Sequence, residues 1–158
     1  MTLSSATQVV MTAVLLVACH GHDNDWAHEP VVTTAFVVQG QHLSIAVPRT
    51  LHESDGGAVT FTQPHGGPVV WVGTAAYAQA DATLETALRQ LRGTLLHSER
   101  RTDGYIYTYE AQGSYIVERY VAGAPAMVCE ARAHTGKDNV ARLEKMCLSL
   151  RAVTPGDR

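Results

Sequence analysis

The chain lacks the charge pattern and the long apolar segment that would assign it to several common classes of protein. It has 12 lysines and arginines against 15 aspartates and glutamates, so there is no basic excess of the kind that binds nucleic acid. Of the 158 residues, 17 % are charged and 46 % are apolar, which is typical of one globular domain and not of a disordered chain. The most apolar segment, residues 9–17, is too short to cross a bilayer as a helix.

Strong catalytic signatures are also missing. The patterns GxSxG, HExxH and GxGxxG and the phosphate-binding P-loop do not occur. The histidines that follow residue 40 are dispersed among expected loops and strand ends: His42, His52, His65, His97 and His134. We therefore expect no enzyme, no catalytic residue and no cofactor.

The start of the chain has the features of an export signal. Residues 9–17 suit the h-region of a signal peptide, and they run into Leu16-Val17-Ala18-Cys19. This ending resembles the lipobox of bacterial lipoproteins. The resemblance implies removal of residues 1–18 and attachment of diacylglycerol and a further acyl chain such as palmitate to Cys19. His20 in place of aspartate favours the periplasmic face of the outer membrane over the inner membrane. The alternative is a buried apolar segment with a free cysteine.

Residues 19–31 are rich in groups that could bind a metal. They include His20, His22, Asp23, Asp25, His28 and Glu29. Imidazole and carboxylate are zinc or copper ligands, so a metal-binding segment is one interpretation. The pattern predicts no helix or strand that would hold these groups together. We favour a flexible tether and assign no metal site.

Residues 32–153 read as a single α+β domain, followed by a frayed tail at 154–158. Strands are expected at 33–38, 42–47, 58–62, 69–73, 105–110, 115–121 and 126–133. One helix is expected from Asp81 to near His97 on the stripe Leu84, Leu88, Leu91 and Leu95. A second is expected from Asp138 on the stripe Val140, Leu143, Met146, Cys147 and Leu150. This order predicts an antiparallel sheet of about six to seven strands with two helices packed on it.

The other two cysteines are expected to form a disulfide. Cys129 lies in an expected strand, and Cys147 lies on the apolar stripe of the helix that should pack on it. An exported domain meets an oxidising compartment. Closing a loop of about 19 residues stabilises by roughly 3 kcal/mol on the chain-entropy model. The alternative is a catalytic or metal-binding pair, but the spacing is neither CxxC nor a zinc pattern.

The opening of the domain carries a family resemblance. Residues 40–48, which end in Pro48, and the apolar segments at 59–62 and 69–72 resemble the start of the Mog1/PsbP-like α/β/α sandwich of small bacterial lipoproteins. The similarity covers about residues 36–152, although Leu51 stands where the family has an aromatic residue. It implies a non-enzymatic, membrane-anchored lipoprotein that binds a protein partner, in particular an immunity protein of a type VI secretion system against a cell-wall-attacking toxin. The alternative is an accessory subunit, or a small-ligand- or metal-binding lipoprotein, of an envelope complex.

Two features could bind such a partner. Tyr105, Tyr107 and Tyr109 alternate, so they share one face of a strand, and tyrosine is a favoured interface residue. The other interpretation is that this face packs under a helix, which the polar residues between and after the tyrosines favour. The second feature is the acidic loop with Glu53 and Asp55, which could enter the cleft of a wall-cutting enzyme or be a solvated connector.

Overall fold

The computed structural model describes Trp26 and residues 28–54, 58–62, 67–74, 83–134 and 139–153. The expected signal peptide at 1–18, Cys19, Asp55 and the tail at 154–158 lie outside the described residues. The described part consists of two antiparallel sheets and two helices. The α+β class expected from the sequence is confirmed.

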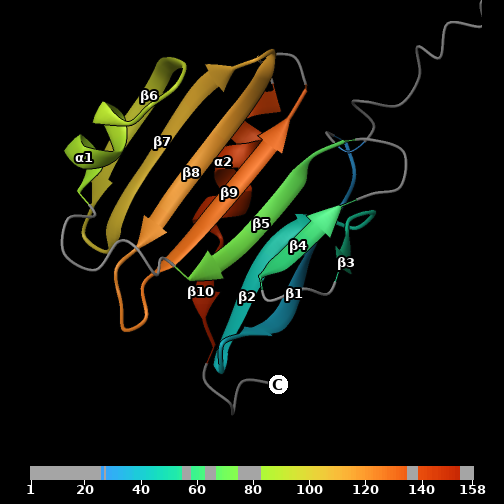
Figure 1. Ribbon diagram of the computed structural model, residues 1–158. Coiled ribbons are helices and arrows are strands. Elements are labelled where there is room, and N and C mark those ends of the chain that lie inside the picture. The colour runs from blue at the N-terminus through green and yellow to red at the C-terminus, as the bar shows by residue number, and fades with distance from the viewer. Residues whose placement is uncertain are drawn as a thin grey trace, which may run out of the picture.

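The larger sheet has seven strands in the order β3-β4-β5-β9-β8-β7-β6. Their bounds are β3 (His52–Ser54), β4 (Val59–Thr62), β5 (Val69–Thr74), β6 (Thr94–Arg101), β7 (Gly104–Ala111), β8 (Ser114–Val121) and β9 (Met127–Ala133). All neighbours in this sheet are antiparallel. Strands β6 to β9 form a meander with short connections, and β9 pairs on its other side with β5 (Figure 1).

The first two strands belong to a separate sheet. It has the order β1-β2-β10, with β1 (Val31–Val38), β2 (Gln41–Pro48) and β10 (Arg151–Ala152). The helix α2 (Val140–Leu148) packs behind the larger sheet in the view of Figure 1. The core is one apolar cluster contributed by both sheets and α2, and it includes Ile45, Phe61, Val72 and Leu143. One face of the larger sheet therefore makes the core.

Trp26 belongs to this core although it lies in the range expected to be a tether. Its side chain is fully buried. Nearby, the guanidinium of Arg142 in α2 donates a hydrogen bond to the backbone carbonyl of Glu29. The packed domain thus begins no later than Trp26.

The first helix is much shorter than the sequence predicts. Helix α1 (Leu84–Arg89) begins at the N-cap Thr83, whose hydroxyl accepts a hydrogen bond from the Thr86 amide at 3.2 Å. The expected continuation to His97 is wrong, because Thr94–Arg101 pairs with β7 as strand β6. At Gly93 a Cβ atom would lie 2.3 Å from the carbonyl oxygen of Glu110, so glycine permits the chain to approach β7 there. The expected N-cap Asp81 lies outside the described residues.

Two kinds of contact hold α2 against the larger sheet. Cys129 of β9 and Cys147 of α2 form the expected disulfide, with Cα atoms 5.5 Å apart. The buried Arg119 of β8 donates hydrogen bonds to the carbonyl of Leu148 at 2.6 Å and to the carboxylate of Asp103 at 2.5 Å. These contacts satisfy a carbonyl at the C-terminal end of α2, which has no partner within the helix.

Candidate functional site

The three alternating tyrosines of β7 lie on the face of the larger sheet opposite α2. Ile106 and Thr108 alternate with these tyrosines along β7, so their side chains lie on the other face of the sheet and point to the core. They are 1 % and 0 % exposed. The expectation that Ile106 and Thr108 form the outer face is wrong, although Tyr107 is buried as that interpretation predicts. The polar Thr108 can be buried because its hydroxyl donates to the carboxylate of Glu144 in α2 at 2.6 Å.

We call this surface the tyrosine face and define it by the side chains that share it. Strand register places them on one side of the sheet: Trp71, Tyr105, Tyr107, Tyr109, Glu118, Tyr120, Glu130 and Arg132. Tyr107 is buried yet does not belong to the core cluster. Within the described residues, the helix on this side is α1, which lies beside β6 (Figure 1) and pairs through Glu85 with Arg100.

The tyrosines stack on one another along and across the strands. The ring centroid of Tyr107 lies 6.0 Å from that of Tyr105 and 5.7 Å from that of Tyr109. Tyr120 of β8 stacks on Tyr105 at 5.2 Å. Each ring is thereby restricted by its neighbours, so the aromatic surface is ordered before any ligand arrives.

Glu118 is held by two phenols of this ladder. Tyr107 donates to its carboxylate at 2.6 Å and Tyr109 donates to it at 3.0 Å. Burial raises the pKa of the Tyr107 hydroxyl, and the hydrogen bond to Glu118 raises it further. Burial and then the charge of Glu118 raise the pKa of Tyr109 in the same way. Both phenols therefore remain neutral hydrogen-bond donors at physiological pH.

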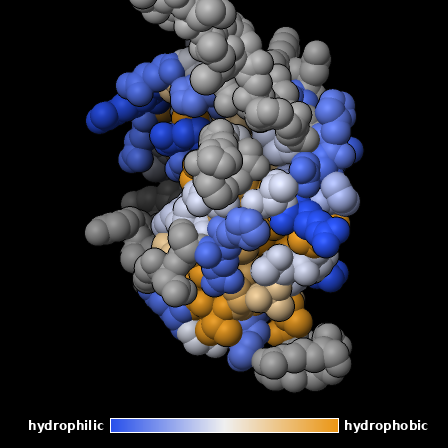
Figure 2. Space-filling view, turned by 90° about the vertical axis from the view of Figure 1, so that its right-hand side faces the viewer, coloured by the Kyte–Doolittle hydropathy of each residue, from blue (hydrophilic) through white to orange (hydrophobic). Residues whose placement is uncertain are grey.

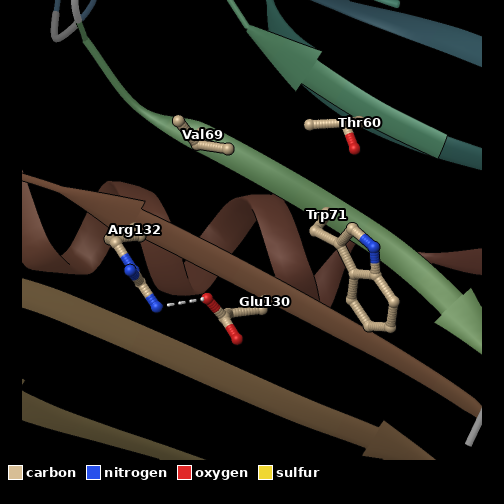
Figure 3. A pocket seen from close by; sticks show the side chains of 5 residues that line it. All are labelled: Thr60, Val69, Trp71, Glu130 and Arg132. Atoms are coloured by element: carbon tan, nitrogen blue, oxygen red, sulfur yellow. Dashed lines mark hydrogen bonds and ion pairs between the residues drawn. The ribbon is translucent and has the colours of Figure 1, made fainter. Parts of the chain in front are cut away.

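A second carboxylate lies directly across the sheet from Glu118. Glu130 of β9 is its register partner, and like charges in that position repel each other. Glu130 accepts a hydrogen bond from Arg132 at 3.0 Å (Figure 3). Burial raises the pKa of Glu130, and Glu118 adds to this, whereas Arg132 lowers it. The site thus contains two acids whose charges oppose each other and one cation that offsets part of the repulsion.

A hollow opens beside this pair. It has a volume of about 430 Å³ and is lined by Thr60, Val69, Trp71, Glu130 and Arg132. In Figure 3 the indole of Trp71 and the carboxylate of Glu130 lie on the same side of neighbouring strands. A Cβ atom at Gly73 would lie 2.4 Å from the Trp71 ring, so glycine at that position allows the indole to lie along β5.

The structure does not bring Glu53 to the tyrosine face. Glu53 is exposed on β3, at the far edge of the larger sheet from β7. Its register partner is Phe61, a core residue, so Glu53 projects on the core side of the sheet. Asp55 and Cys19 lie outside the described residues.

Four residues of the tyrosine face were not predicted from the sequence: Trp71, Glu118, Glu130 and Arg132. A signal was present in residues 127–133, where glutamate and arginine alternate with small or apolar side chains. That alternation predicts which residues of one strand share a face. It cannot predict that four strands place these side chains in one row, because strand order and register come from tertiary pairing.

Other groups in the described part are less suited to bind a ligand. No cluster of three or more histidine, cysteine, aspartate or glutamate side chains that could hold a metal ion occurs among the residues described. None of the described helices is long and apolar enough to cross a membrane.

Figure 2 shows apolar side chains in the lower half of the side where β1 and β2 lie, and β1 exposes Val31, Val32 and Val37.

Comparisons with family models and with curated proteins add no relative. No protein-family model matches the chain, and a search of curated proteins finds no match.

Proposed function

We propose that this chain is a non-enzymatic lipoprotein of the bacterial cell envelope that binds a protein partner through its tyrosine face. The observation that supports this proposal is the row of stacked tyrosines with Trp71 and two glutamates on the sheet face opposite the core. Tyrosine and tryptophan are enriched at protein interfaces, because they offer a large contact area and lose little side-chain entropy. The hydrogen bonds that already fix Glu118 reduce the ordering cost of binding.

Attachment through Cys19 would hold the domain at the periplasmic face of the outer membrane. The sequence Leu16-Val17-Ala18-Cys19 supports this location, and the disulfide between Cys129 and Cys147 fits an oxidising compartment. Labelled palmitate should be incorporated into the wild-type protein and not into Cys19→Ser. A labelled Cys19→Ser protein would contradict the lipid anchor.

The partner we propose is a secreted toxin that attacks the cell wall, so that the chain acts as its immunity protein. This choice follows the resemblance of residues 40–48, 59–62 and 69–72 to lipoproteins of the Mog1/PsbP-like kind. Such an immunity protein needs a preformed surface that covers the toxin, and the tyrosine face meets that need.

A competition experiment tests the proposal. A strain in which the gene is deleted should be killed by sister cells that secrete the toxin, and the wild-type gene should restore survival. A gene with Trp71→Ala and Tyr109→Ala should fail to protect although the protein reaches normal abundance. The control is Val37→Ala, which truncates an exposed apolar side chain of β1 and should protect fully.

Two results would contradict the proposal. If the deletion strain survives as well as the wild type, the immunity role is lost. If the variant with Trp71→Ala and Tyr109→Ala protects as well as Val37→Ala, the tyrosine face does not bind the toxin. Crosslinking that recovers an envelope assembly in place of a toxin would favour an accessory subunit.

A further inference from the structure

We propose that the tyrosine face receives an arginine side chain of the protein partner, with its guanidinium on the carboxylates of Glu118 and Glu130 and against the indole of Trp71. The inference rests on the proposed function, since the arginine belongs to the protein that the face binds. It adds the chemistry by which that partner would be recognised.

Strand register arranges the recognition groups in one row across the sheet. Tyr107 is opposite Glu118, Glu118 is opposite Glu130, and Glu130 is opposite Trp71. Neighbouring strands are about 4.8 Å apart, so the row is about 14 Å long. It has two acids in the middle and an aromatic ring at each end. A cation placed over the acids would therefore lie beside an aromatic side chain.

The charges of this row are not balanced within the described residues. Glu118 accepts hydrogen bonds from the neutral phenols of Tyr107 and Tyr109, while Glu130 pairs with Arg132. Arg100, the other arginine that register places on this face, pairs with Glu85 of α1. Of the two neighbouring carboxylates, Glu130 has a guanidinium partner, and Glu118 has two neutral hydroxyl donors. Burial and the charge of Glu118 both raise the pKa of Glu130. A second cation would lower that pKa and would reduce the repulsion between the two acids.

The shape of the site favours arginine over lysine. A planar guanidinium can donate to two carboxylates at once and stack on an aromatic ring, whereas an ammonium group is a compact and strongly hydrated charge. The hollow of about 430 Å³ is lined by both Trp71 and Glu130. Figure 3 shows one oxygen of Glu130 bound by Arg132 and the second oxygen directed away from it. That second oxygen is where an incoming guanidinium would donate.

The experiment measures binding of a blocked Gly-Gly-Arg-Gly-Gly peptide to the full-length chain by nuclear magnetic resonance. Two matched peptides carry citrulline, which has nearly the shape of arginine without its charge, or lysine. We expect the arginine peptide to shift the indole N–H signal of Trp71. We expect the citrulline peptide to bind at least about tenfold more weakly and the lysine peptide several-fold more weakly.

The chain provides a matched control variant. Glu130→Gln and Glu118→Gln should each weaken binding of the arginine peptide by about five- to tenfold. Glu99 also pairs with an arginine two residues along its strand, Arg101, at 2.7 Å, but register places it on the core side of the sheet. Glu99→Gln makes the same change of net charge and should leave binding unchanged. The spectrum of each variant reports whether the domain is folded.

The possible results separate this inference from the proposed function. Equal binding of the arginine and citrulline peptides, no binding of either, or equal weakening by Glu99→Gln and Glu130→Gln would each overturn the arginine site. The proposed function would still stand if Trp71→Ala and Tyr109→Ala abolish protection in the competition experiment. Failure of that experiment would overturn the proposed function whatever the peptides do.

Discussion

Loss of the disulfide between Cys129 and Cys147 should remove a large part of the stability of the domain. Both cysteines are fully buried and join β9 to α2. Reducing the bond changes neither the composition of the core nor the sequence, so it isolates the effect of the crosslink. The experiment should use the full-length chain with Cys19→Ser, because a third thiol would exchange with the pair.

The size of the effect follows from the loop that the bond closes. The cysteines are 18 residues apart, and the chain-entropy model gives a stabilisation of about 3 kcal/mol for a loop of that length. Domains of this size are stable by about 5–15 kcal/mol. Reduction should therefore remove a fifth or more of the free energy of unfolding and lower the Tm by roughly 10 °C. The helix should stay docked under native conditions, because Arg119 and the apolar packing of Leu143 still hold it.

Urea unfolding of the oxidised and reduced proteins, followed by circular dichroism, measures this difference. Cys129→Ala with Cys147→Ala should unfold at a still lower urea concentration than the reduced protein, because it also removes buried sulfur atoms. The double variant must not respond to reductant, which controls for effects of the reductant itself. Coincident unfolding curves for the oxidised and reduced proteins would refute the reasoning.

Three further predictions concern other parts of the structure. Arg119→Leu leaves carbonyls at the end of α2 without their charged donor and should cost about 2 kcal/mol in urea unfolding; an unchanged midpoint would contradict this role. Gly73→Val should displace the Trp71 ring, because a Cβ atom at residue 73 would lie 2.4 Å from it. The fluorescence emission of Trp71, measured in a Trp26→Phe background, should therefore shift. An unchanged spectrum would show that the position of the ring does not depend on glycine at residue 73. Glu130→Gln removes the repulsion by Glu118 and should stabilise the domain by roughly 0.2–1 kcal/mol at neutral pH. Folding raises the pKa of Glu130, so the wild type should lose stability relative to Glu130→Gln as the pH rises through that folded pKa; stability curves with no such divergence would contradict the assignment.

Local pattern predicts much of this fold. Alternating residues and turn signals place most strands within a few residues of their observed bounds, and the stripe Leu143, Met146 and Cys147 marks α2. The helix expected from Asp81 to His97 ends at Arg89, and the last leucine of the stripe lies in strand β6. Leu95 is 42 % exposed in β6. It pairs with Tyr109 of β7 and is not buried by a helix. The helical pattern of the leucines was overridden by the pairing of Thr94–Arg101 with β7.

The candidate site is predicted less well than the fold, for two reasons. Thr108 is polar, which favours a solvent-facing position, yet its side chain is buried and its hydroxyl donates a hydrogen bond to the carboxylate of Glu144. Thr108 therefore shares the buried face of β7 with Ile106, and the tyrosines lie on the other face. Glu118 and Glu130 become neighbours through the pairing of β8 with β9, which no spacing in the sequence specifies.

The tyrosine face contains features that stability alone does not favour. Two glutamates lie opposite each other, and burial raises the pKa of one of them, so the ionised pair opposes folding at neutral pH. Replacing Glu130 by glutamine would relieve that cost while keeping the shape of the surface. Residues that reduce stability are typical of binding and catalytic sites, where the unfavourable interaction is relieved by the ligand. For Glu118 and Glu130 the ligand that relieves it is a cation, and the neighbouring rings of Tyr107 and Trp71 select a planar one. Stability should therefore rise, and binding should fall, in the same Glu130→Gln protein.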